Sequence, residues 1–178
     1  MQERCKIGVV IGNANSPHAV NIMKGIDQAS KECDVQLMYF MNVSSPYTAQ
    51  LYPPDKSIGW DYQKSAIYDY ARYVKADVLI MTYGMMSIFM KSDYGKQYLE
   101  YFRNVPCVLI NEQTDRPNWT SIIVDNYNGM YELVEHLVRD HGYHNFAFLA
   151  GPPGNTDACQ RKRALLGVTN KYDLPIDE

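Results

Sequence analysis

The chain has 178 residues, a formal net charge of −3 and 46% hydrophobic residues, as an ordinary globular protein does. The small negative charge gives no general attraction to nucleic acid or to an anionic membrane surface. The apolar run near the N-terminus is short and leads into a strand pattern, so it does not predict a signal peptide, and no apolar stretch approaches the roughly 18 residues of a membrane-spanning helix.

Short apolar runs recur along the chain and predict β-strands. They lie at residues 7–12, 35–41, 77–84, 105–111, 121–125 and 146–151. The runs are nearly continuous instead of alternating with polar residues. This is typical of parallel strands, because both faces of a parallel sheet are covered.

Helical patterns lie between these runs. Ser16-Pro17 is a favourable pair for the N-cap and first position of a helix. Further helices are expected after Asp61, at residues 94–103 and 127–141, and from Thr156 or Asp157 to about Asn170. Their expected inward residues are Ile67, Tyr70, Ala71 and Val74, then Tyr98, Leu99 and Phe102, then Met130, Leu133, Val134, Leu137 and Val138. The alternation of strands and helices predicts an α/β fold with right-handed crossovers.

The cysteines are far apart in the sequence and form no CxxC pair. They are Cys5, Cys33, Cys107 and Cys159. This spacing favours reduced, mostly buried thiols over a disulfide framework or a zinc ribbon. We therefore expect a cytoplasmic protein.

Polar residues of the types that bind a polyol follow the predicted strands. In a parallel α/β sheet, ligands bind beyond the carboxyl ends of the strands. Amides, hydroxyls, carboxylates and guanidinium groups pair well with sugar hydroxyls, which both donate and accept. The candidates are Asn13, Asn15, Thr82, Tyr83, Asn111, Glu112 and Arg161. Each is also a common cap or turn residue, but together they favour a small-molecule cleft.

Other site chemistries fit the sequence poorly. The loops at 12–18 and 151–161 follow strands, but neither matches a dinucleotide or P-loop motif, although the second has glycines that suit either an anion site or a plain turn. His136, His141 and His144 lack further ligands at metal-binding spacing. No activated nucleophile with a base is evident. We expect no metal, no cofactor and no enzymatic activity.

Several segments resemble the effector-binding core of the LacI/GalR repressor family. The specific ones are residues 104–111, 121–152 and 157–161, and the opening segment 6–40 also looks like that family's first strand, helix and strand. The resemblance implies a periplasmic-binding-protein-like type I fold, with a parallel sheet covered by helices on both faces. It also implies a complete first lobe at 1–124 and an incomplete second lobe at 125–178.

The resemblance also implies roles for individual residues. Ligand contacts are implied for Asn13 and Asn15 after the first strand, Thr82 after the third, Asn111 after the fourth and Arg161 in the second lobe. Tyr83 is also a ligand-binding candidate, because it is a residue of suitable type that lies where a predicted strand ends. Asp125 lies where the chain crosses between lobes, so it is the expected hinge residue, and it or Asn126 is the expected cap of the next helix.

The implied function is ligand sensing, with a sugar or related metabolite as the small polar ligand. The sensing domain belongs to a LacI-like transcription regulator or to a signalling protein such as a GGDEF diguanylate cyclase, and a homodimer is expected. The family's helix-turn-helix precedes the first strand, where this chain has only five or six residues, so the chain itself is not expected to contact nucleic acid. A flavodoxin-like or Rossmann-like enzyme fragment and a ligand-free dimerisation platform remain the alternatives.

Overall fold

The computed structural model describes most of the chain. The described residues are 4–43, 62–87, 92–151 and 155–176. The expected cap Asp61 lies outside them. The chain divides into two compact units, Met1–Ile123 and Val124–Glu178, and each is described by itself.

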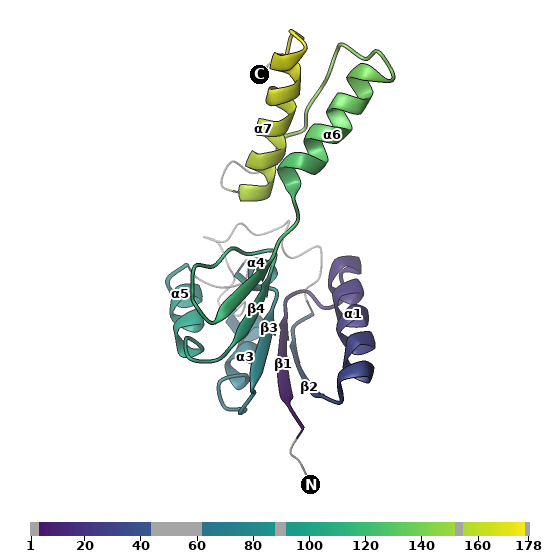
Figure 1. The fold of residues 1–178 in the computed structure, drawn as a ribbon. Coiled ribbons are helices and arrows are strands. Elements are labelled where there is room, and N and C mark those ends of the chain that lie inside the picture. The colour runs from purple at the N-terminus through teal and green to yellow at the C-terminus, as the bar shows by residue number, and fades with distance from the viewer. Residues whose placement is uncertain (1–3, 44–61, 88–91, 152–154, 177–178) are drawn as a thin grey trace. The chain divides into compact units, whose positions relative to one another are not determined.

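The first unit is built on a parallel sheet with the strand order β2-β1-β3-β4-β5 (Figure 1). The strands are β1 (Lys6–Ile11), β2 (Gln36–Met41), β3 (Val78–Met81), β4 (Cys107–Ile110) and β5 (Trp119–Ile122). The chain runs from β1 to β2 on one side and then crosses to β3 on the other. Successive strands are therefore added to one side of β1 first and then to the other, so the strand order reverses between β1 and β3. In sheets of this kind, ligands bind at the carboxyl ends of the strands at this point.

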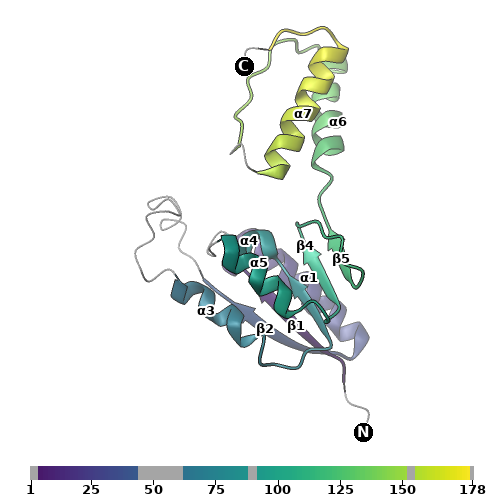
Figure 2. The same ribbon diagram turned by 90° about the vertical axis from the view of Figure 1, so that its left-hand side faces the viewer.

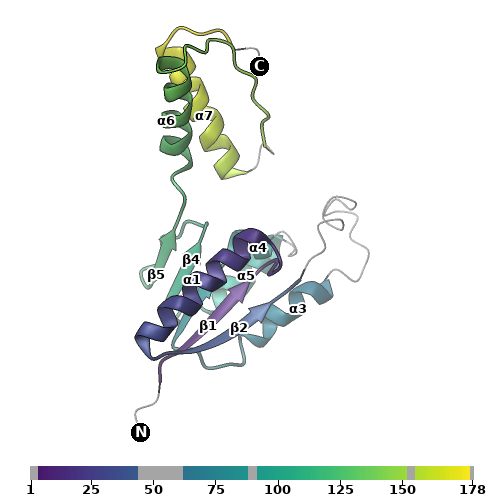
Figure 3. The same ribbon diagram turned by 90° about the vertical axis from the view of Figure 1, so that its right-hand side faces the viewer.

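Helices cover both faces of this sheet, as predicted. The helix α1 (Pro17–Cys33) lies on one face, and α3 (Tyr62–Tyr70) and α5 (Ser92–Tyr101) lie on the other (Figures 2 and 3). Alternate residues of β1 belong to the two hydrophobic cores on either face of the sheet. Val9 and Ile11 pack on the α1 side, while Val10 packs in the core on the opposite face. The predicted α/β fold, a parallel sheet with helices on both faces, is confirmed.

The start of α1 follows the prediction. The Ala19 N–H donates to the Ser16 hydroxyl at 3.2 Å, and Pro17 occupies the first helical position. Asp34 ends the helix in the left-handed region with φ 44°. The cap satisfies a backbone donor that would otherwise lack an intrahelical partner.

The buried face of α3 differs from the prediction. Tyr68 is fully buried, and its carbonyl accepts a hydrogen bond from the Tyr98 hydroxyl at 2.9 Å. Tyr70 is 62% exposed and Val74 is also exposed, so their predicted inward placement is wrong. Tyr68 and Tyr70 cannot share a narrow helical stripe because residues two apart lie on different faces. The helix ends at Tyr70, so Val74 follows it in the connection to β3.

A short helix, α4 (Tyr83–Ser87), follows β3 directly and was not predicted. It passes so close to the end of β1 that a Cβ atom at Gly12 would lie 2.7 Å from the Met85 backbone carbonyl. Backbone atoms cannot move aside as a flexible side chain can. Glycine is therefore required where β1 meets α4.

The second unit consists of two helices, α6 (Asn126–Arg139) and α7 (Thr156–Lys171), and the chain between and after them. Their shared core holds the buried residues Val134, Val138, Leu165 and Val168. Leu133, which was predicted to face inward, is 53% exposed. Within this unit α6 packs against one helix, so only a narrow stripe of it is buried.

The N-cap of α7 is Asn155, one residue before Thr156 and two before Asp157, the predicted candidates. Its side-chain oxygen accepts a hydrogen bond from the Ala158 N–H at 2.8 Å. Asn155 can cap because its backbone is extended while Thr156 is already helical. Asn and Thr are both favourable caps, so the sequence pattern could not decide between adjacent residues.

The predicted strand at 146–151 is not a strand in the structure. Phe146 and Phe148 are half-buried against α6 and α7, whereas Leu149 is 99% exposed. The alternation that a strand shows is therefore present, but a strand also requires a neighbour to pair its backbone groups. The described part of this unit offers no such neighbour, so the prediction is wrong.

The cysteines also differ from the prediction. All four are free thiols, but Cys5, Cys33 and Cys159 are exposed and only Cys107 is buried. The three exposed cysteines lie at or near the ends of β1, α1 and α7, whereas Cys107 lies within the sheet. Burial raises the pKa of the Cys107 thiol to about 12.

We predict that replacing Gly12 with alanine destabilises the first unit. Gly12→Ala forces a methyl group against the Met85 backbone, and overpacking of this kind costs about 1–3 kcal/mol. Gly25→Ala is the matched control, because a Cβ there meets nothing within 4 Å on α1 and alanine favours a helix by about 1 kcal/mol. Urea unfolding of both variants measures the difference. Equal stabilities would contradict the close approach at Gly12.

We also predict unequal reactivity of the thiols. Cys5, Cys33 and Cys159 react with iodoacetamide in the native chain because they are exposed. Cys107 stays unmodified up to about pH 9, since its thiolate is rare well below its raised pKa. Peptide mass spectrometry with and without denaturant measures the modification at each site. Native labelling of Cys107 at the rate of the others would contradict its burial.

Candidate functional site

The ends of β1 and β3 are joined by a buried hydrogen bond. The Gly12 N–H donates to the Thr82 hydroxyl oxygen at 3.0 Å, and the Thr82 N–H donates to the Val10 carbonyl at 3.0 Å. Thr82 is only 1% exposed. Thr82, one of the predicted ligand-binding residues, therefore joins the carboxyl ends of β1 and β3.

Asn13 extends this edge toward β2. It adopts a left-handed backbone with φ 51°, and its N–H donates to the side-chain oxygen of Asn42 at 2.6 Å. The Asn42 carbonyl accepts a further hydrogen bond from the Ala14 N–H at 2.8 Å. Asn42 is 5% exposed, and its side-chain nitrogen has no hydrogen-bond partner among the described residues.

Sequence reasoning missed Asn42, although a signal was present. It directly follows an apolar strand, as Asn13 and Asn111 do after theirs. Asparagine tolerates the left-handed turns that end strands, and that preference alone selects it at several strand ends. The structure adds that Asn42 holds the turn after β1, which spacing along the chain does not reveal.

Asn111 brings the end of β4 to the start of α1. It is left-handed with φ 60°, and its side-chain nitrogen lies 3.0 Å from Nε2 of His18. His18, in the first turn of α1, was not singled out from the sequence. That turn has no acidic residue, so the positive end of the helix dipole is not neutralised by a carboxylate there and favours oxygen atoms with negative charge density.

Three predicted residues therefore lie at one edge of the sheet: Asn13, Thr82 and Asn111, after β1, β3 and β4. Asn15 is exposed in the turn before α1. Amide, hydroxyl and imidazole groups of Asn13, Thr82, Asn111 and His18 supply hydrogen-bond donors and acceptors at this edge, while the candidate Glu112, which follows Asn111, lies on the Tyr83 side. Such a set binds a neutral polar molecule better than it performs acid–base chemistry.

Tyr83 points away from these residues. A Cβ atom at Gly95 of α5 would lie 2.5 Å from the Tyr83 hydroxyl, so the ring packs against that helix. Burial, and to a lesser extent the charge of Glu112, raise the pKa of Tyr83 above its ordinary value. The tyrosine is therefore a neutral side chain that packs on the α5 side of the sheet.

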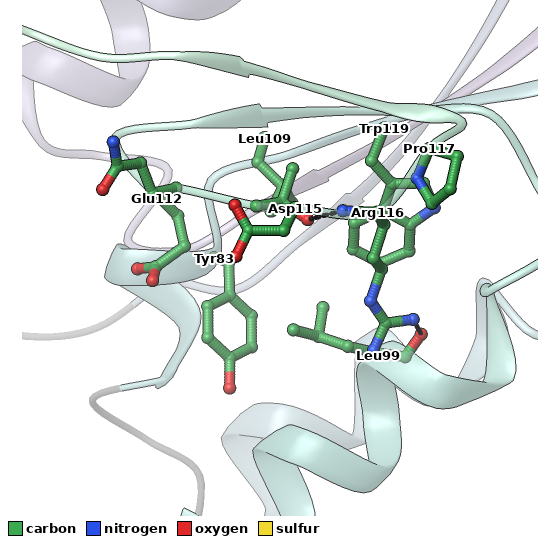
Figure 4. A pocket seen from close by; sticks show the side chains of 10 residues that line it. Tyr83, Leu99, Leu109, Glu112, Asp115, Arg116, Pro117 and Trp119 are labelled. Carbon is green, nitrogen blue, oxygen red and sulfur yellow. Dashed lines mark hydrogen bonds between the residues drawn. The ribbon is translucent and has the colours of Figure 1, made fainter.

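Tyr83 lines a hollow of about 520 Å³ in which Glu112 lies beside it and Arg116 with Trp119 lies across from it, with Asp115 between (Figure 4). The Arg116 guanidinium donates to the Leu99 carbonyl and to Glu100 and lies 4.5 Å from the centre of the Trp119 ring. Arg116 is therefore held by protein groups. The hollow does not include Asn13, Thr82 or Asn111 in its lining.

In the second unit, Asp125 caps α6. Its two carboxylate oxygens accept hydrogen bonds from the Asn128 N–H at 3.0 Å and from the Asn128 side chain at 2.7 Å. The first of these, then the second, holds the pKa of Asp125 below its ordinary value. The predicted cap is confirmed, and a hinge role stays a prediction.

Arg161 lies on α7, six residues into the helix. Its Nε donates to the side-chain oxygen of Asn126 at 2.8 Å, and Asn126 is 6% exposed. Arg161 and the first-unit candidates belong to different units, so the structure does not test whether they share a site. Among the described residues, no group of three or more histidine, cysteine or acidic side chains has a metal-binding arrangement.

Similar proteins are known at the level of sequence. No protein-family profile matches the chain. A probable HTH-type transcriptional repressor, ExuR of Bacillus subtilis (strain 168), is 26% identical over 118 residues, which cover 61% of this chain and 35% of that protein. No helix among the described residues is long and apolar enough to cross a membrane.

Solved structures of LacI-type regulators share the fold. A putative ribose operon repressor from Burkholderia thailandensis has a TM-score of 0.71 at 13% identity, over 99% of this chain and 59% of its own. The lac repressor dimer bound to operator and an anti-inducer has 0.67 at 18%, over 98% and 54%. A sugar-binding LacI-family regulator from Escherichia coli, complexed with phosphate, has 0.63 at 14%, over 97% and 55%.

These likenesses confirm the fold that the sequence resemblance implied. The chain has the periplasmic-binding-protein-like fold of LacI-family cores, and it spans little more than half the length of the solved regulators. Similarity at identities below 20% shows a shared fold but not a shared function, because one fold hosts many functions. Function must be argued from the residues at the strand ends.

We predict that the Thr82 hydroxyl is needed to hold that edge together. Thr82→Val keeps the shape but removes the acceptor of the buried Gly12 N–H, which costs about 1–3 kcal/mol. Thr82→Ser keeps the acceptor and loses one methyl group, a cost of about 0.8 kcal/mol. Amide hydrogen exchange at Gly12 should accelerate in the valine variant and stay slow in the serine variant. Unchanged exchange in the valine variant would contradict the prediction.

Proposed function

We propose that the chain is a sensing domain for a small polar metabolite, a sugar or a closely related compound, in a LacI-like transcription regulator. The observation that carries the proposal is that Asn13, Thr82 and Asn111 follow the neighbouring strands β1, β3 and β4 and so lie at the same edge of the sheet. Ligands of open α/β sheets bind at this edge. The groups there match the donors and acceptors of sugar hydroxyls.

The similar proteins support this assignment. The solved relatives include a sugar-binding regulator and a ribose operon repressor, and the relative found by sequence is a probable transcriptional repressor. None of them is an enzyme by its description. A regulator therefore fits better than a GGDEF signalling protein, which stays a second possibility for the output attached to this domain.

Further parts of the proposal concern partners and location. A homodimer is proposed because one of the similar structures is a dimer. DNA contact is assigned to parts of a regulator outside the described residues, and the domain is placed in the cytoplasm, where transcription regulators act. Ligand closure would bias the output only by as much as the ligand prefers the closed state over the open one.

The rival functions find less support among the described residues. An enzyme needs a nucleophile with a base, or a cofactor cradle, whereas Asn13, Thr82, Asn111 and His18 offer amides, a hydroxyl and an imidazole, and Glu112 lies beside Tyr83 on the α5 side. A ligand-free dimerisation platform needs no convergent polar groups at all. Both alternatives differ from the sensor in their response to metabolites, which makes the test direct.

The test is the response of the full-length gene product to small molecules. Thermal unfolding is followed with D-glucose, D-galactose, D-ribose and D-fructose, and separately with NAD and ATP. A sensor should be stabilised by at least one sugar, because a ligand that binds only the folded state raises its stability. Stabilisation by a nucleotide alone would favour the enzyme, and no response to a broad metabolite panel would favour the platform.

Asn111 supplies a site-specific prediction. Asn111→Gly removes the amide but tolerates the φ of 60°, so the fold should persist while sugar affinity falls about tenfold, the worth of one good hydrogen bond. Asn104→Gly is the matched control, because Asn104 is exposed and precedes β4 at the opposite edge. Isothermal titration measures both. Equal affinities in the two variants would remove Asn111 from the site.

A further inference from the structure

We propose that His136 and His141, at the C-terminal end of α6, form a two-histidine site for a divalent late transition metal such as Cu²⁺ or Zn²⁺. The Nε2 atoms of the two rings lie 3.1 Å apart, and both residues are exposed. Imidazole nitrogen is a preferred ligand of these metals. The site belongs to the second unit alone, and it does not depend on the proposed sensing function.

The end of α6 determines where His141 lies. Gly142 adopts a left-handed backbone with φ 67°, and its N–H donates to the Val138 carbonyl at 3.1 Å. The next N–H, that of Tyr143, donates to the Leu137 carbonyl at 3.1 Å. Glycine in this conformation ends a helix because the turn satisfies the last carbonyls. The turn follows His141 directly, so the backbone of His141 is held just beyond the last turn of α6.

Asp140 fixes the orientation of the His136 ring. Nδ1 of His136 lies 2.7 Å from Oδ2 of Asp140. An ionised carboxylate only accepts hydrogen bonds, so Nδ1 carries the proton, and in the neutral ring Nε2 carries a lone pair. Histidines that bind metals in proteins commonly donate their other N–H to a carboxylate in this way. The contact with Asp140 therefore directs the lone pair of Nε2 toward His141.

The surrounding charges favour a cation at this position. The Nε–H of Arg139 donates to Oδ1 of Asp140 at 2.8 Å, and a terminal nitrogen of Arg139 donates to Oδ2 at 3.2 Å. These two residues form an ion pair whose charges sum to zero. The remaining local field is that of α6, and the C-terminal end of a helix dipole attracts positive charge.

The separation of the two ring nitrogens matches a shared metal ion. Bonds from zinc to histidine nitrogen are about 2.0–2.1 Å long, so two nitrogens on one ion lie about 2.9–3.4 Å apart in tetrahedral or square-planar geometry. The observed 3.1 Å between His136 and His141 lies within this range. In the structure, the two nitrogens share one proton in a hydrogen bond. A metal ion replaces that proton when the proton of the neutral His141 ring moves from Nε2 to Nδ1.

Sequence spacing did not indicate this pair. Residues three or four positions apart are neighbours on a helix, whereas His136 and His141 are five apart. The Tyr143 ring stacks on the His141 ring, with the ring centres 5.9 Å apart, and helps to orient it. The part of the chain that the structure describes has no third protein ligand in a metal-binding arrangement. Water is therefore expected to complete the coordination of the ion.

The test is metal binding by the full-length protein without an affinity tag. Its accessible thiols are first alkylated with iodoacetamide, because Cys5, Cys33 and Cys159 are exposed and thiolates also bind these metals. Isothermal titration with copper(II) chloride should show tighter binding than titration with zinc chloride, as the Irving–Williams order requires. Magnesium chloride should show no binding at this site, because Mg²⁺ prefers oxygen ligands.

Variants identify the ligands. His136→Gln and His141→Gln should each lower the affinity for Cu²⁺ about tenfold or more, because a single nitrogen then remains. Asp140→Asn holds Nδ1 less strongly and should lower the affinity about 10–100-fold. The controls His144→Gln and Glu132→Gln remove an exposed histidine and an exposed acid nearby, and they should leave the affinity unchanged.

A double variant tests whether Asp140 acts through His136. In the His136→Gln background, Asp140→Asn should cause no further loss of affinity, because the ring that it orients is absent. A general effect of the Asp140 charge would instead lower the affinity equally in both backgrounds. That result would overturn the positioning role of Asp140.

A second measurement reports each ring separately. Diethyl pyrocarbonate acylates neutral imidazole nitrogens, and peptide mass spectrometry measures the modification of each histidine. Zn²⁺ should protect His136 and His141 and leave His144 reactive. In Asp140→Asn, the same protection should require about 10–100-fold more Zn²⁺.

The outcomes decide the proposal without reference to sugar binding. Equal metal affinities of the wild type and of the His136→Gln and His141→Gln variants overturn it. Equal protection of His136, His141 and His144 by Zn²⁺ also overturns it, because the metal would then bind separate surface rings. A loss in His144→Gln as large as in the other two variants overturns the two-histidine assignment.

Discussion

The hydrogen bond from the Gly12 N–H to the Thr82 hydroxyl is the interaction on which the candidate site depends. All strands of a parallel sheet end at the same edge, and their last backbone groups lack a ladder partner there. A side chain from the neighbouring strand end satisfies one of these groups. The strands β1 and β3 are neighbours at the point where the strand order reverses. The same hydrogen bond therefore stabilises the fold and holds together the strand ends where a ligand would bind.

The elements of the fold were largely predictable, and the failures have a common physical cause. Continuous apolar runs identified all five strands, and Ser16-Pro17 identified the start of α1, because these signals are local. The segment at 146–151 has the alternation of a strand, as the burial of Phe146 and Phe148 shows, but strand formation depends on a partner elsewhere. Tyr70 and Leu133 failed for a similar reason, since burial depends on what packs against a helix and not on its own pattern.

The candidate site was predictable by position but not by geometry. Asn13 and Asn111 were selected because they follow strands, and the structure gives both a left-handed backbone, which is a structural reason for asparagine. That reason does not exclude ligand binding, because the side-chain amides stay at the same edge. Tyr83 adjoins Thr82 in sequence yet packs against α5, because the chain turns from β3 into the helix α4 at this residue. The contacts of His18, Asn42 and Asn126 join residues 29 or more positions apart, which no local pattern contains.

The candidate residues of the two units differ in charge, and each set has a physical reason. In the first unit Asn13, Thr82 and Asn111 are neutral groups, which pair with neutral hydroxyls without the desolvation cost of a buried charge. Arg161 carries a charge, and a charge that is held at one end only keeps its attraction for oxygen atoms. An amide can hold it in this way, because a carboxylate at position 126 would form an ion pair and neutralise the charge. Asn126, beside the capping Asp125, therefore orders the arginine and leaves its charge unpaired at this contact.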